Sequence, residues 1–347
     1  MGTLSFKEII GQENAAVFLR QVIANDRIAS AYLFAGIQGI GKTTTAMAFA
    51  LLLNCMGPVD GDGCGKCPSC KKIIAGNHPD LMVIEPDQEK KTIGINQIRE
   101  INRSLAFSPV LGQYRITIID PAEGMTPEAA NAFLKTLEEP PSGNIFILNV
   151  KEPGELLPTI VSRCQKVPFK PLPTEKIVQW LTRERTLDRE EAKIVAGLSE
   201  GSLGKALRMA EGDLLADRVS WVHMLDRAIN GSPDVLLDTA QKFSDLGKKE
   251  AHSNSKELKD DRITLVLGVW RSWFRDMVLI KLGDAIHLMV NTDLVSHLRT
   301  ASLGYTFDGL MKSLAVIARA EHDLMDNKNP LILIERALFG LKGAVHS

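Results

Sequence analysis

Eight residues near the N-terminus constrain the fold more than any other stretch of the chain. Residues 36–43 read Gly-Ile-Gln-Gly-Ile-Gly-Lys-Thr, the pattern of glycine, four residues, glycine-lysine and then serine or threonine. A loop of this kind wraps its backbone N–H groups around phosphate oxygens. An apolar run at 31–35 precedes it, and an alanine- and leucine-rich stretch at 44–54 follows it. This order predicts a strand, a phosphate-binding P-loop and a helix within a parallel α/β sheet.

The loop predicts a nucleotide site in which each residue has a defined role. Lys42 would reach the β and γ phosphates, and the Thr43 hydroxyl would ligate Mg²⁺. ATP with Mg²⁺ is therefore the cofactor that the loop admits. The residues expected to bind it are Gly36, Gly39, Gly41, Lys42, Thr43 and Thr44, together with Asp120 from a later strand.

Four cysteines follow the helix at the spacing C-x8-C-x2-C-x2-C: Cys55, Cys64, Cys67 and Cys70. Four thiolates close a tetrahedral Zn²⁺ site, and a four-cysteine set with no open position is structural rather than catalytic. Disulfides are the alternative, but a reducing compartment disfavours them. We expect a zinc module at about residues 55–72, and we expect Cys164 to be a small buried residue rather than a ligand.

A second apolar run that predicts a strand is followed by an acidic residue. Residues 115–119 form an apolar run, and Asp120 follows at the position where a parallel sheet can place a carboxylate beside the P-loop and its Mg²⁺. The next residue is Pro121, which has no carboxylate and cannot activate water. Because no water-activating group follows Asp120, the site is expected to hold nucleotide rather than cleave it.

Further strands are expected at 81–84 and 144–150.

Composition limits the class of protein. The chain has 347 residues, of which 45% are hydrophobic and 24% charged, as in an ordinary globular protein of two or three domains. Lys plus Arg number 41 against 42 Asp plus Glu, so no bulk positive field attracts nucleic acid or an anionic membrane. The N-terminal residues show no signal-peptide pattern, and we expect a cytoplasmic protein without a membrane partner.

The segment at 130–141, the Ser-Arg-Cys sequence at 162–164, the cysteine spacing and Gly-Asn-His-Pro-Asp at 76–80 together resemble the AAA+ clamp-loader subunits of bacterial DNA polymerase III. The resemblance is specific from about residue 5 to 210. It implies an AAA+ α/β domain over residues 1–170, a helical lid over 171–210 and a helical oligomerisation collar over 211–347. The implied partners are the gamma/tau motor subunits and the delta subunit, with the sliding clamp and primed DNA reached through the complex.

Three departures favour the non-hydrolysing, delta prime-like branch of that family. Pro121 stands where motor subunits carry the catalytic glutamate, and Val150 and Lys151 lie near the position of their polar sensor. Gly204 stands at the position of their sensor arginine. An ATP-hydrolysing motor remains an alternative if Glu123 or Lys205 supplies a missing group. A pure interaction subunit with an unused P-loop is the other alternative.

The resemblance also implies a role for Arg163. In the family, the arginine of Ser-Arg-Cys lies at a subunit interface and reaches the γ-phosphate of a neighbour's ATP, and the guanidinium fork suits phosphate oxygens. Without the resemblance, a structural salt bridge, for instance to Glu155, would be preferred. We therefore expect Arg163 to act as an arginine finger in the neighbour's site.

The C-terminal part carries no motif of its own. It predicts a helical bundle, with an apolar helix at 263–282, an exposed loop at 247–261 and a last helix that begins with Asn329 as cap and Pro330 at its first position.

Overall fold

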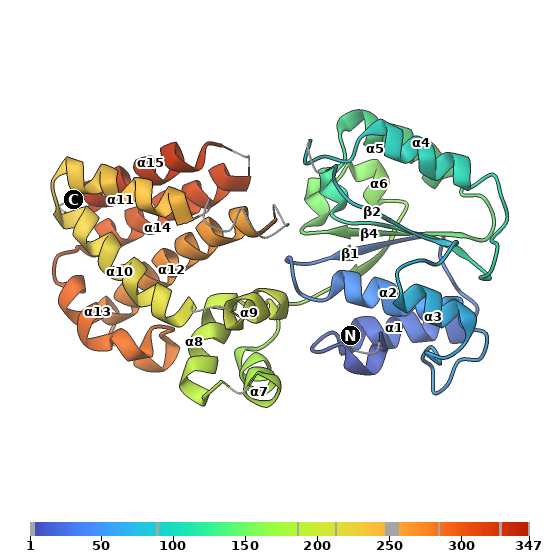
Figure 1. Cartoon of the computed structure of the whole chain (residues 1–347), viewed down its shortest axis with the longest axis horizontal. Coiled ribbons are helices and arrows are strands. Elements are labelled where there is room, and N and C mark those ends of the chain that lie inside the picture. Colours follow the sequence, from blue (N-terminus) through green and yellow to red (C-terminus); the bar gives the residue numbers. More distant parts are fainter. Residues whose placement is uncertain are drawn as a thin grey trace. The chain divides into compact units, whose positions relative to one another are not determined.

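A computed structural model of the chain describes residues 4–87, 90–185, 187–211, 214–246, 257–283, 285–325 and 328–345. The chain divides into two compact units, one formed by residues 1–176 with 201–205 and the other by 177–200 with 206–347 (Figure 1). The division expected at residues 170 and 210 stays a prediction.

The first unit is built on a five-stranded parallel sheet of order β2-β3-β4-β1-β5. The strands are β1 (Ala31–Ala35), β2 (Leu81–Ile84), β3 (Arg115–Ile119), β4 (Asn144–Val150) and β5 (Gln165–Pro168). Every residue of β3 and β4 is buried, as the near-continuous apolar runs predict for strands covered on both faces. The parallel α/β sheet expected from the sequence is confirmed.

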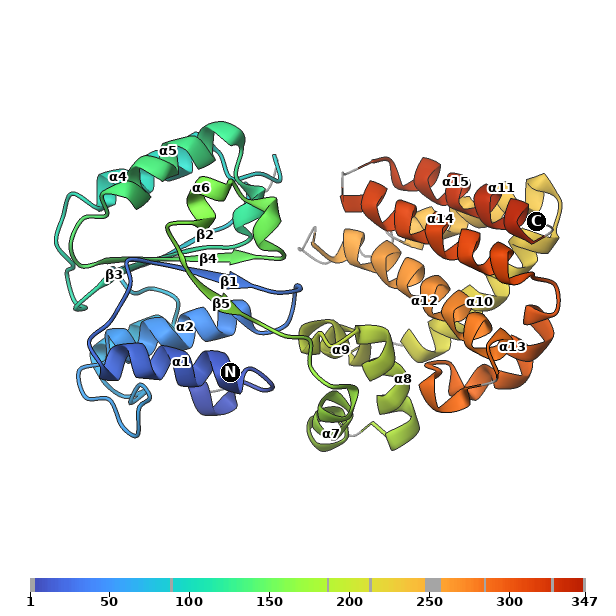
Figure 2. The same ribbon diagram turned by 180° about the vertical axis from the view of Figure 1, so that it is seen from behind.

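Helices cover both faces of this sheet. On one side lie α1 (Glu13–Ala24), α2 (Lys42–Leu53) and α3 (Pro68–Ile74), and on the other α4 (Ile95–Ser104), α5 (Pro127–Glu138) and α6 (Pro158–Val161) (Figure 2). Helix α5 starts as predicted, because Thr126 caps it by accepting the Ala129 N–H and Pro127 occupies its first turn. Short 3-10 turns lie at Phe6–Glu8, Ala122–Gly124 and Pro153–Glu155.

The order of the strands determines which loops meet at the candidate site. Strand β1 lies between β4 and β5, so the loop that leaves β1 opens beside the carboxyl end of β4, and β3 lies on the far side of β4. Strand register pairs Phe34 with Asn149 and Ile119 with Leu148. Residues that follow β1, β3 and β4 are therefore brought together at one end of the sheet.

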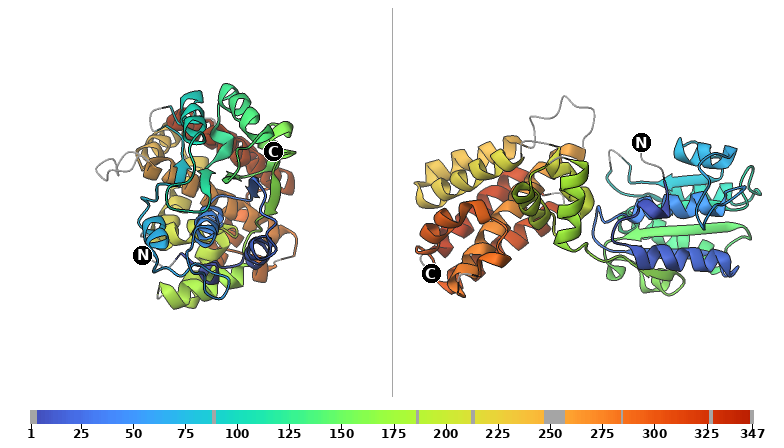
Figure 3. Two further views of the ribbon diagram at one scale, coloured as in Figure 1. Left: turned by 90° about the vertical axis from the view of Figure 1, so that its right-hand side faces the viewer. Right: turned by 90° about the horizontal axis from the view of Figure 1, so that it is seen from below.

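The second unit is helical. Its helices include α8 (Arg189–Ser199), α10 (Leu214–Asn230), α11 (Pro233–Leu246), α12 (Glu257–Lys281), α13 (Val295–Ser302), α14 (Phe307–Met325) and α15 (Pro330–Ala344). Helices α7 (Thr174–Glu184) and α9 (Leu203–Ala210) begin in the first unit and continue in the second. Helix α12 packs on α14, and α14 packs on α15 (Figure 3).

Aromatic side chains on α12 form the centre of this bundle. Trp270, Trp273 and Phe274 are 0% exposed, and the Phe243 ring packs edge-on against Trp270 with centroids 5.1 Å apart. Asn329 caps α15 as predicted, by accepting the Leu331 N–H. The loop expected at 247–261 falls partly outside the described residues, and from residue 257 onward the segment belongs to α12, so that part of the expectation is wrong.

Candidate functional site

The P-loop forms the transition from β1 to α2. Gly41 caps α2 in the left-handed conformation (φ 101°), and the open space beside its Cα leaves the helix N-terminus free to meet an anion. Lys42 is 8% exposed, and its Nζ donates to the carbonyl oxygens of Gly36 (2.5 Å) and Ile37 (3.0 Å). Thr43 and Thr44 are exposed. The backbone and side chains thus fit a phosphate group.

Burial has the largest effect on the pKa of Lys42. It lowers the pKa of the ammonium below its ordinary value, although the carboxylates of Asp120, Glu123 and Glu155 act in the opposite direction. A bound polyphosphate would bring further negative charge to this buried cation, which is the compensation that a desolvated ammonium requires.

Two glycines let a distant segment touch the P-loop. Gly204 donates its N–H to the Gly39 carbonyl at 2.8 Å, and Ser202 Oγ donates to the Gln38 carbonyl at 2.8 Å. A Cβ on Gly204 would lie 2.9 Å from Gly39 Cα, and one on Gly39 (φ +72°) would lie 2.6 Å from Ser202 Oγ. The backbone contact therefore leaves no room for a side chain at residue 204 without a local shift.

Asp120 lies directly after β3 and meets the P-loop. Its Oδ2 accepts a hydrogen bond from Thr43 Oγ1 and another from Asn149 Nδ2 at 2.8 Å. Asn149 Nδ2 also donates to Thr43 Oγ1 at 3.3 Å. Thr43 and Asp120 offer the oxygen atoms that Mg²⁺ prefers, whereas the third group in contact with both is an amide nitrogen, which is not a metal ligand.

Sequence reasoning did not single out Asn149. It placed the sensor position at Val150 and Lys151, one and two residues further on. The usable signal was a buried polar residue in an otherwise apolar strand, because β4 reads Asn-Ile-Phe-Ile-Leu-Asn-Val. Its role depends on which loops lie beside the end of β4, and the sequence does not give that order.

Glu123 lies three residues after Asp120, in the turn that contains Pro121. Its Oε1 accepts the Lys151 N–H at 3.3 Å, and its Oε2 is buried without a hydrogen-bond partner among the described residues. Burial raises the pKa of this carboxyl group, and the nearby Glu155 carboxylate adds to the rise.

The four cysteines form a cluster in which all sulfur atoms lie within 4.8 Å of one another. None of them is disulfide-bonded. Backbone N–H groups point at the sulfurs: Cys64 N–H to Cys55 Sγ (3.2 Å), Cys67 N–H to Cys64 Sγ (3.3 Å) and Cys70 N–H to Cys67 Sγ (3.4 Å). Backbone N–H groups of Lys66 and Cys67 lower the pKa of Cys64 to about 6, whereas burial raises the pKa of Cys55 and of Cys70. The grouping of four sulfur atoms, rather than these shifts, is what could hold a metal ion through thiolates.

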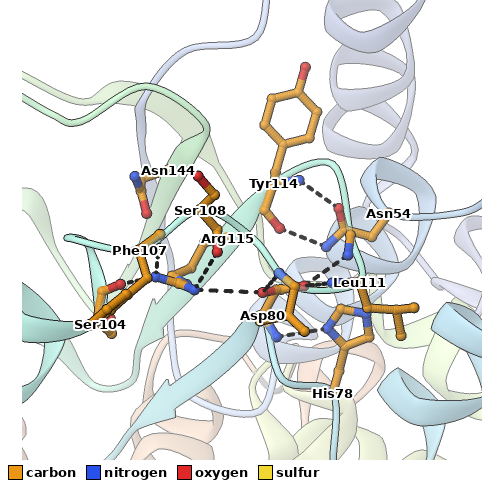
Figure 4. A network of polar contacts seen from close by, with 12 residues as sticks. Asn54, His78, Asp80, Ser104, Phe107, Ser108, Leu111, Tyr114, Arg115 and Asn144 are labelled. Carbon is orange, nitrogen blue, oxygen red and sulfur yellow. Dashed lines mark hydrogen bonds and ion pairs between the residues drawn. The ribbon is translucent and has the colours of Figure 1, made fainter.

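A buried polar network joins this cysteine module to the sheet, and Figure 4 shows the part of it around His78, Asp80 and Arg115. Ser69, between Cys67 and Cys70, is hydrogen-bonded to His78 Nε2 at 3.0 Å, and His78 Nδ1 accepts the Asp80 N–H at 3.1 Å. The Asp80 carboxylate accepts three backbone N–H groups of residues 110–112, at 2.7, 2.7 and 2.8 Å. Arg115 lies 3.7 Å from Asp80 and donates to carbonyls of the loop at 104–108.

Arg163 lies after α6 at the surface. Its Nη2 forms an ion pair with Glu138 Oε1 at 2.8 Å, and its Nη1 donates to the Thr159 carbonyl at 3.0 Å. The salt-bridge alternative gave Glu155 as an example of a partner for Arg163, and that prediction is wrong. The Arg163 side chain is 35% exposed and Glu138 is 51% exposed. Cys164 is half-buried and packs against the core of the first unit, outside the cysteine cluster.

Comparisons with known proteins find similarity to subunits of DNA polymerase III. A family model described as DNA polymerase III, delta subunit, matches residues 11–173. The tau subunit of DNA polymerase III from Bacillus subtilis is 30% identical over 96% of this chain and 60% of that protein. The delta' subunit from the same organism is 27% identical over 98% of this chain and 99% of that protein. The delta' subunit from Escherichia coli is 37% identical over 53% and 55%, respectively.

The chain thus spans about 60% of the tau relative and nearly the whole of one delta' relative. A crystal structure of a gamma subunit-related protein from Thermotoga maritima is 20% identical, covers 94% of this chain and 99% of its own, and has a TM-score of 0.46. No helix in the described part of the chain combines the length and hydrophobicity that a bilayer crossing requires.

Proposed function

We propose that the chain is the delta prime subunit of an AAA+ clamp loader of bacterial DNA polymerase III and that it does not itself hydrolyse ATP, since the relatives to which it is similar are subunits of that polymerase. It would work with gamma/tau motor subunits and a delta subunit to load the sliding clamp onto primed DNA. The residues that follow Asp120 support the proposal. Pro121 has no carboxylate that could activate water. The next acid, Glu123, already accepts the Lys151 N–H.

The surroundings of Gly204 support the same assignment. A motor-type arginine at this position would need a side chain where the Gly204 backbone lies against Gly39. The neighbouring Lys205 belongs to the same close contact, since its N–H donates to Ser202 Oγ at 3.1 Å. The site is therefore suited to holding nucleotide in Gly36–Thr43 and poorly suited to cleaving it.

We infer that the cysteine cluster binds one structural Zn²⁺. Four thiols within 4.8 Å match the size of a tetrahedral site with Zn–S distances of about 2.3 Å, and N–H groups directed at the sulfurs stabilise thiolates. Zinc would supply the folding free energy that the glycine-rich segment around Cys64 lacks.

The helical part is proposed to contain the lid, over residues 171–210, and the oligomerisation collar, over 211–347. Exposed apolar side chains on α15 support the collar assignment: Ile332 is 61% exposed and Phe339 is 48% exposed, seven residues apart and so on one face of the helix. Such a face would be covered by neighbouring clamp-loader subunits.

Arg163 is proposed to reach the nucleotide of an adjacent motor subunit. Its ion pair with Glu138 is half-exposed and therefore weak, so the guanidinium can be recruited by a phosphate at little cost. An arginine finger typically contributes about 10³ to 10⁵ in rate.

The test is ATP turnover by the chain alone and by the assembled complex of motor subunits, delta, clamp and primed DNA. Arg163→Ala should abolish the contribution of one motor site in the complex. Arg185→Ala is the matched control, since Arg185 is 40% exposed and also paired with a glutamate, and it should leave turnover unchanged. Glu138→Ala should also leave turnover unchanged, because it removes only the resting partner.

Turnover by the chain alone would contradict the assignment and would identify a motor subunit. Unchanged turnover with Arg163→Ala would show that Arg163 has only a structural role.

A further inference from the structure

Three consecutive carbonyl groups of the P-loop, those of residues 38–40, accept hydrogen bonds from outside the loop. All three donors belong to the first unit, although they come from segments that are far apart in sequence. The bonds run from Ser202 Oγ to the Gln38 carbonyl (2.8 Å), from the Gly204 N–H to the Gly39 carbonyl (2.8 Å) and from Gln12 Nε2 to the Ile40 carbonyl (3.4 Å).

These bonds determine where the N–H groups of the loop point. The peptides that follow residues 38–40 are trans, and in a planar trans peptide the C=O of one residue and the N–H of the next point in opposite directions. Donors that hold the carbonyls of residues 38–40 therefore turn the N–H groups of residues 39–41 to the other side of the loop. Among the residues that the structure describes, none accepts a hydrogen bond from these three N–H groups. They are the groups with which a loop of this pattern cradles phosphates.

The Gln12 amide has one favourable orientation. Gln12 is 4% exposed, its Oε1 accepts the Lys170 N–H at 3.2 Å, and its Nε2 donates to the Lys170 carbonyl at 2.8 Å. Turning the amide over would place Oε1 against the Lys170 carbonyl and the NH₂ group against the Lys170 N–H. The second hydrogen of Nε2 is thus directed at the Ile40 carbonyl.

Ser202 is confined in a similar way. It is 3% exposed, and its Oγ accepts the Lys205 N–H at 3.1 Å, so the hydroxyl hydrogen is available for the Gln38 carbonyl. The Gly204 N–H, in the same segment, completes the set. The loop is therefore held, on the side away from the phosphates, by two buried side chains and one backbone group.

We propose that Gln12 and Ser202 are positioning residues of the nucleotide site. They act on the phosphates through the loop, because they hold the N–H groups of residues 39–41 in the phosphate-binding orientation before a ligand binds. A loop held in this way loses less conformational freedom on binding, and this is the general reason that a preorganised site has a higher affinity. The inference rests on the proposed nucleotide-holding role of the P-loop and is independent of assembly into a clamp loader.

The experiment is an equilibrium titration of the full chain with a fluorescent ATP analogue at a fixed Mg²⁺ concentration, followed by displacement with inorganic tripolyphosphate. Tripolyphosphate carries the phosphate chain without ribose or base, so its Kd reports on the anion site alone. Ser202→Ala removes the hydroxyl donor. Gln12→Met removes the amide but keeps a side chain of similar length.

Each variant has a matched control whose hydrogen bonds lie outside the P-loop. Ser199→Ala removes a 1% exposed serine whose Oγ donates to the Ala196 carbonyl at 2.8 Å. Gln97→Met removes a glutamine that also joins two backbone groups, since its Oε1 accepts the Gly94 N–H at 3.0 Å and its Nε2 donates to the Glu85 carbonyl at 2.8 Å.

Ser202→Ala and Gln12→Met should each raise the Kd of tripolyphosphate and the Kd of the ATP analogue by a similar factor, about threefold to tenfold, which corresponds to the net contribution of one hydrogen bond. Both controls should stay within about twofold of wild type. Thermal melting shows which variants are folded, and the titrations are made well below the melting temperatures, so a general loss of stability does not change the Kd. If Gln12→Met does not fold, Ser202→Ala decides the outcome.

Three results would overturn the proposal. The first is a tripolyphosphate Kd within about twofold of wild type in the folded variants. The second is a weaker Kd for the analogue alone, because the lost bonds would then act on the base or the ribose. The third is a wild-type chain that does not bind tripolyphosphate. ATP turnover by the assembled complex is a separate measurement, and the delta prime assignment is judged by that measurement.

Discussion

The Ser69 hydroxyl and His78 Nε2 are joined by a buried hydrogen bond of 3.0 Å between the cysteine module and the segment that leads into β2. Because His78 Nδ1 accepts the Asp80 N–H, the ring proton must lie on Nε2, and His78 donates to Ser69. The ring is thus held as a neutral imidazole in a single tautomer. The module is fixed to the sheet through a side chain that the metal itself does not require.

Ser69→Ala should lower the free energy of unfolding of the first unit by about 1–3 kcal/mol, because it leaves the buried imidazole N–H of His78 without an acceptor. Urea denaturation monitors this change. The exposed Ser142→Ala should stay within about 0.5 kcal/mol of wild type. Equal stability of the two variants would show that the bond to His78 contributes nothing.

Metal analysis after dialysis should find about one Zn²⁺ per chain, since four thiolates complete the coordination sphere. Cys55→Ser should reduce the zinc content to a small fraction of that value and lower the melting temperature. Cys164→Ser is the control, because Cys164 lies outside the cluster, and it should retain the metal. A wild-type zinc content near zero would contradict the four-cysteine assignment.

Asp80→Asn should cost about 3–5 kcal/mol at neutral pH, because it removes a buried charge that pairs with Arg115 and accepts three backbone N–H groups. Burial alone would raise the pKa of Asp80, but the N–H groups of Gly112, Val110 and Leu111 outweigh burial and hold the pKa below its ordinary value. The stabilisation is therefore present above the unfolded pKa of about 4 and is lost as pH falls through the folded pKa.

The difference between wild type and Asp80→Asn should accordingly narrow in urea titrations carried out below about pH 4. Asp60→Asn is the control, since the Asp60 side chain is 74% exposed and pairs with a solvated lysine. A difference that stays constant from pH 7 to pH 3 would show that the Asp80 charge is not the source of the stabilisation.

Gly204→Ala should destabilise the first unit by about 1–3 kcal/mol and weaken nucleotide binding, because the new Cβ would lie 2.9 Å from Gly39 Cα and push the P-loop. Gly154→Ala, where nothing lies within 4 Å of the added Cβ, should be close to neutral. Thermal melting and equilibrium titration with a fluorescent ATP analogue measure the two effects. If Gly204→Ala is as stable as wild type and binds nucleotide equally well, the backbone around Gly39 can shift at no cost and the prediction is wrong.

Local patterns predicted most of the elements of the first unit. The strands at 81–84, 115–119 and 144–150 follow from short apolar runs, and the starts of α5 and α15 follow from Thr126 and Asn329 as caps. These features depend on neighbours in sequence. The P-loop and the grouping of the cysteines belong to the same class, because each motif is contained within a few turns of chain.

The remaining features depend on residues that meet only after folding. The ion pair of Arg163 joins it to Glu138 on α5 rather than to Glu155, because α5 and α6 pack together. The contact of Asn149 with Asp120 requires β3 and β4 to be neighbours, and the contact of Gly204 with Gly39 requires a segment 165 residues away to return to the P-loop. No periodicity encodes these pairings.

The register of β4 has a consequence for how such a site changes in evolution. Alternate residues of a strand face opposite sides of the sheet, so Asn149 faces the P-loop while Leu148 and Val150 lie in the core on the other face. A one-residue insertion or deletion within β4 would exchange the amide for an aliphatic side chain in a single mutational event. The side chain that meets Thr43 and Asp120 is thus determined by the length of the strand as well as by the identity of residue 149.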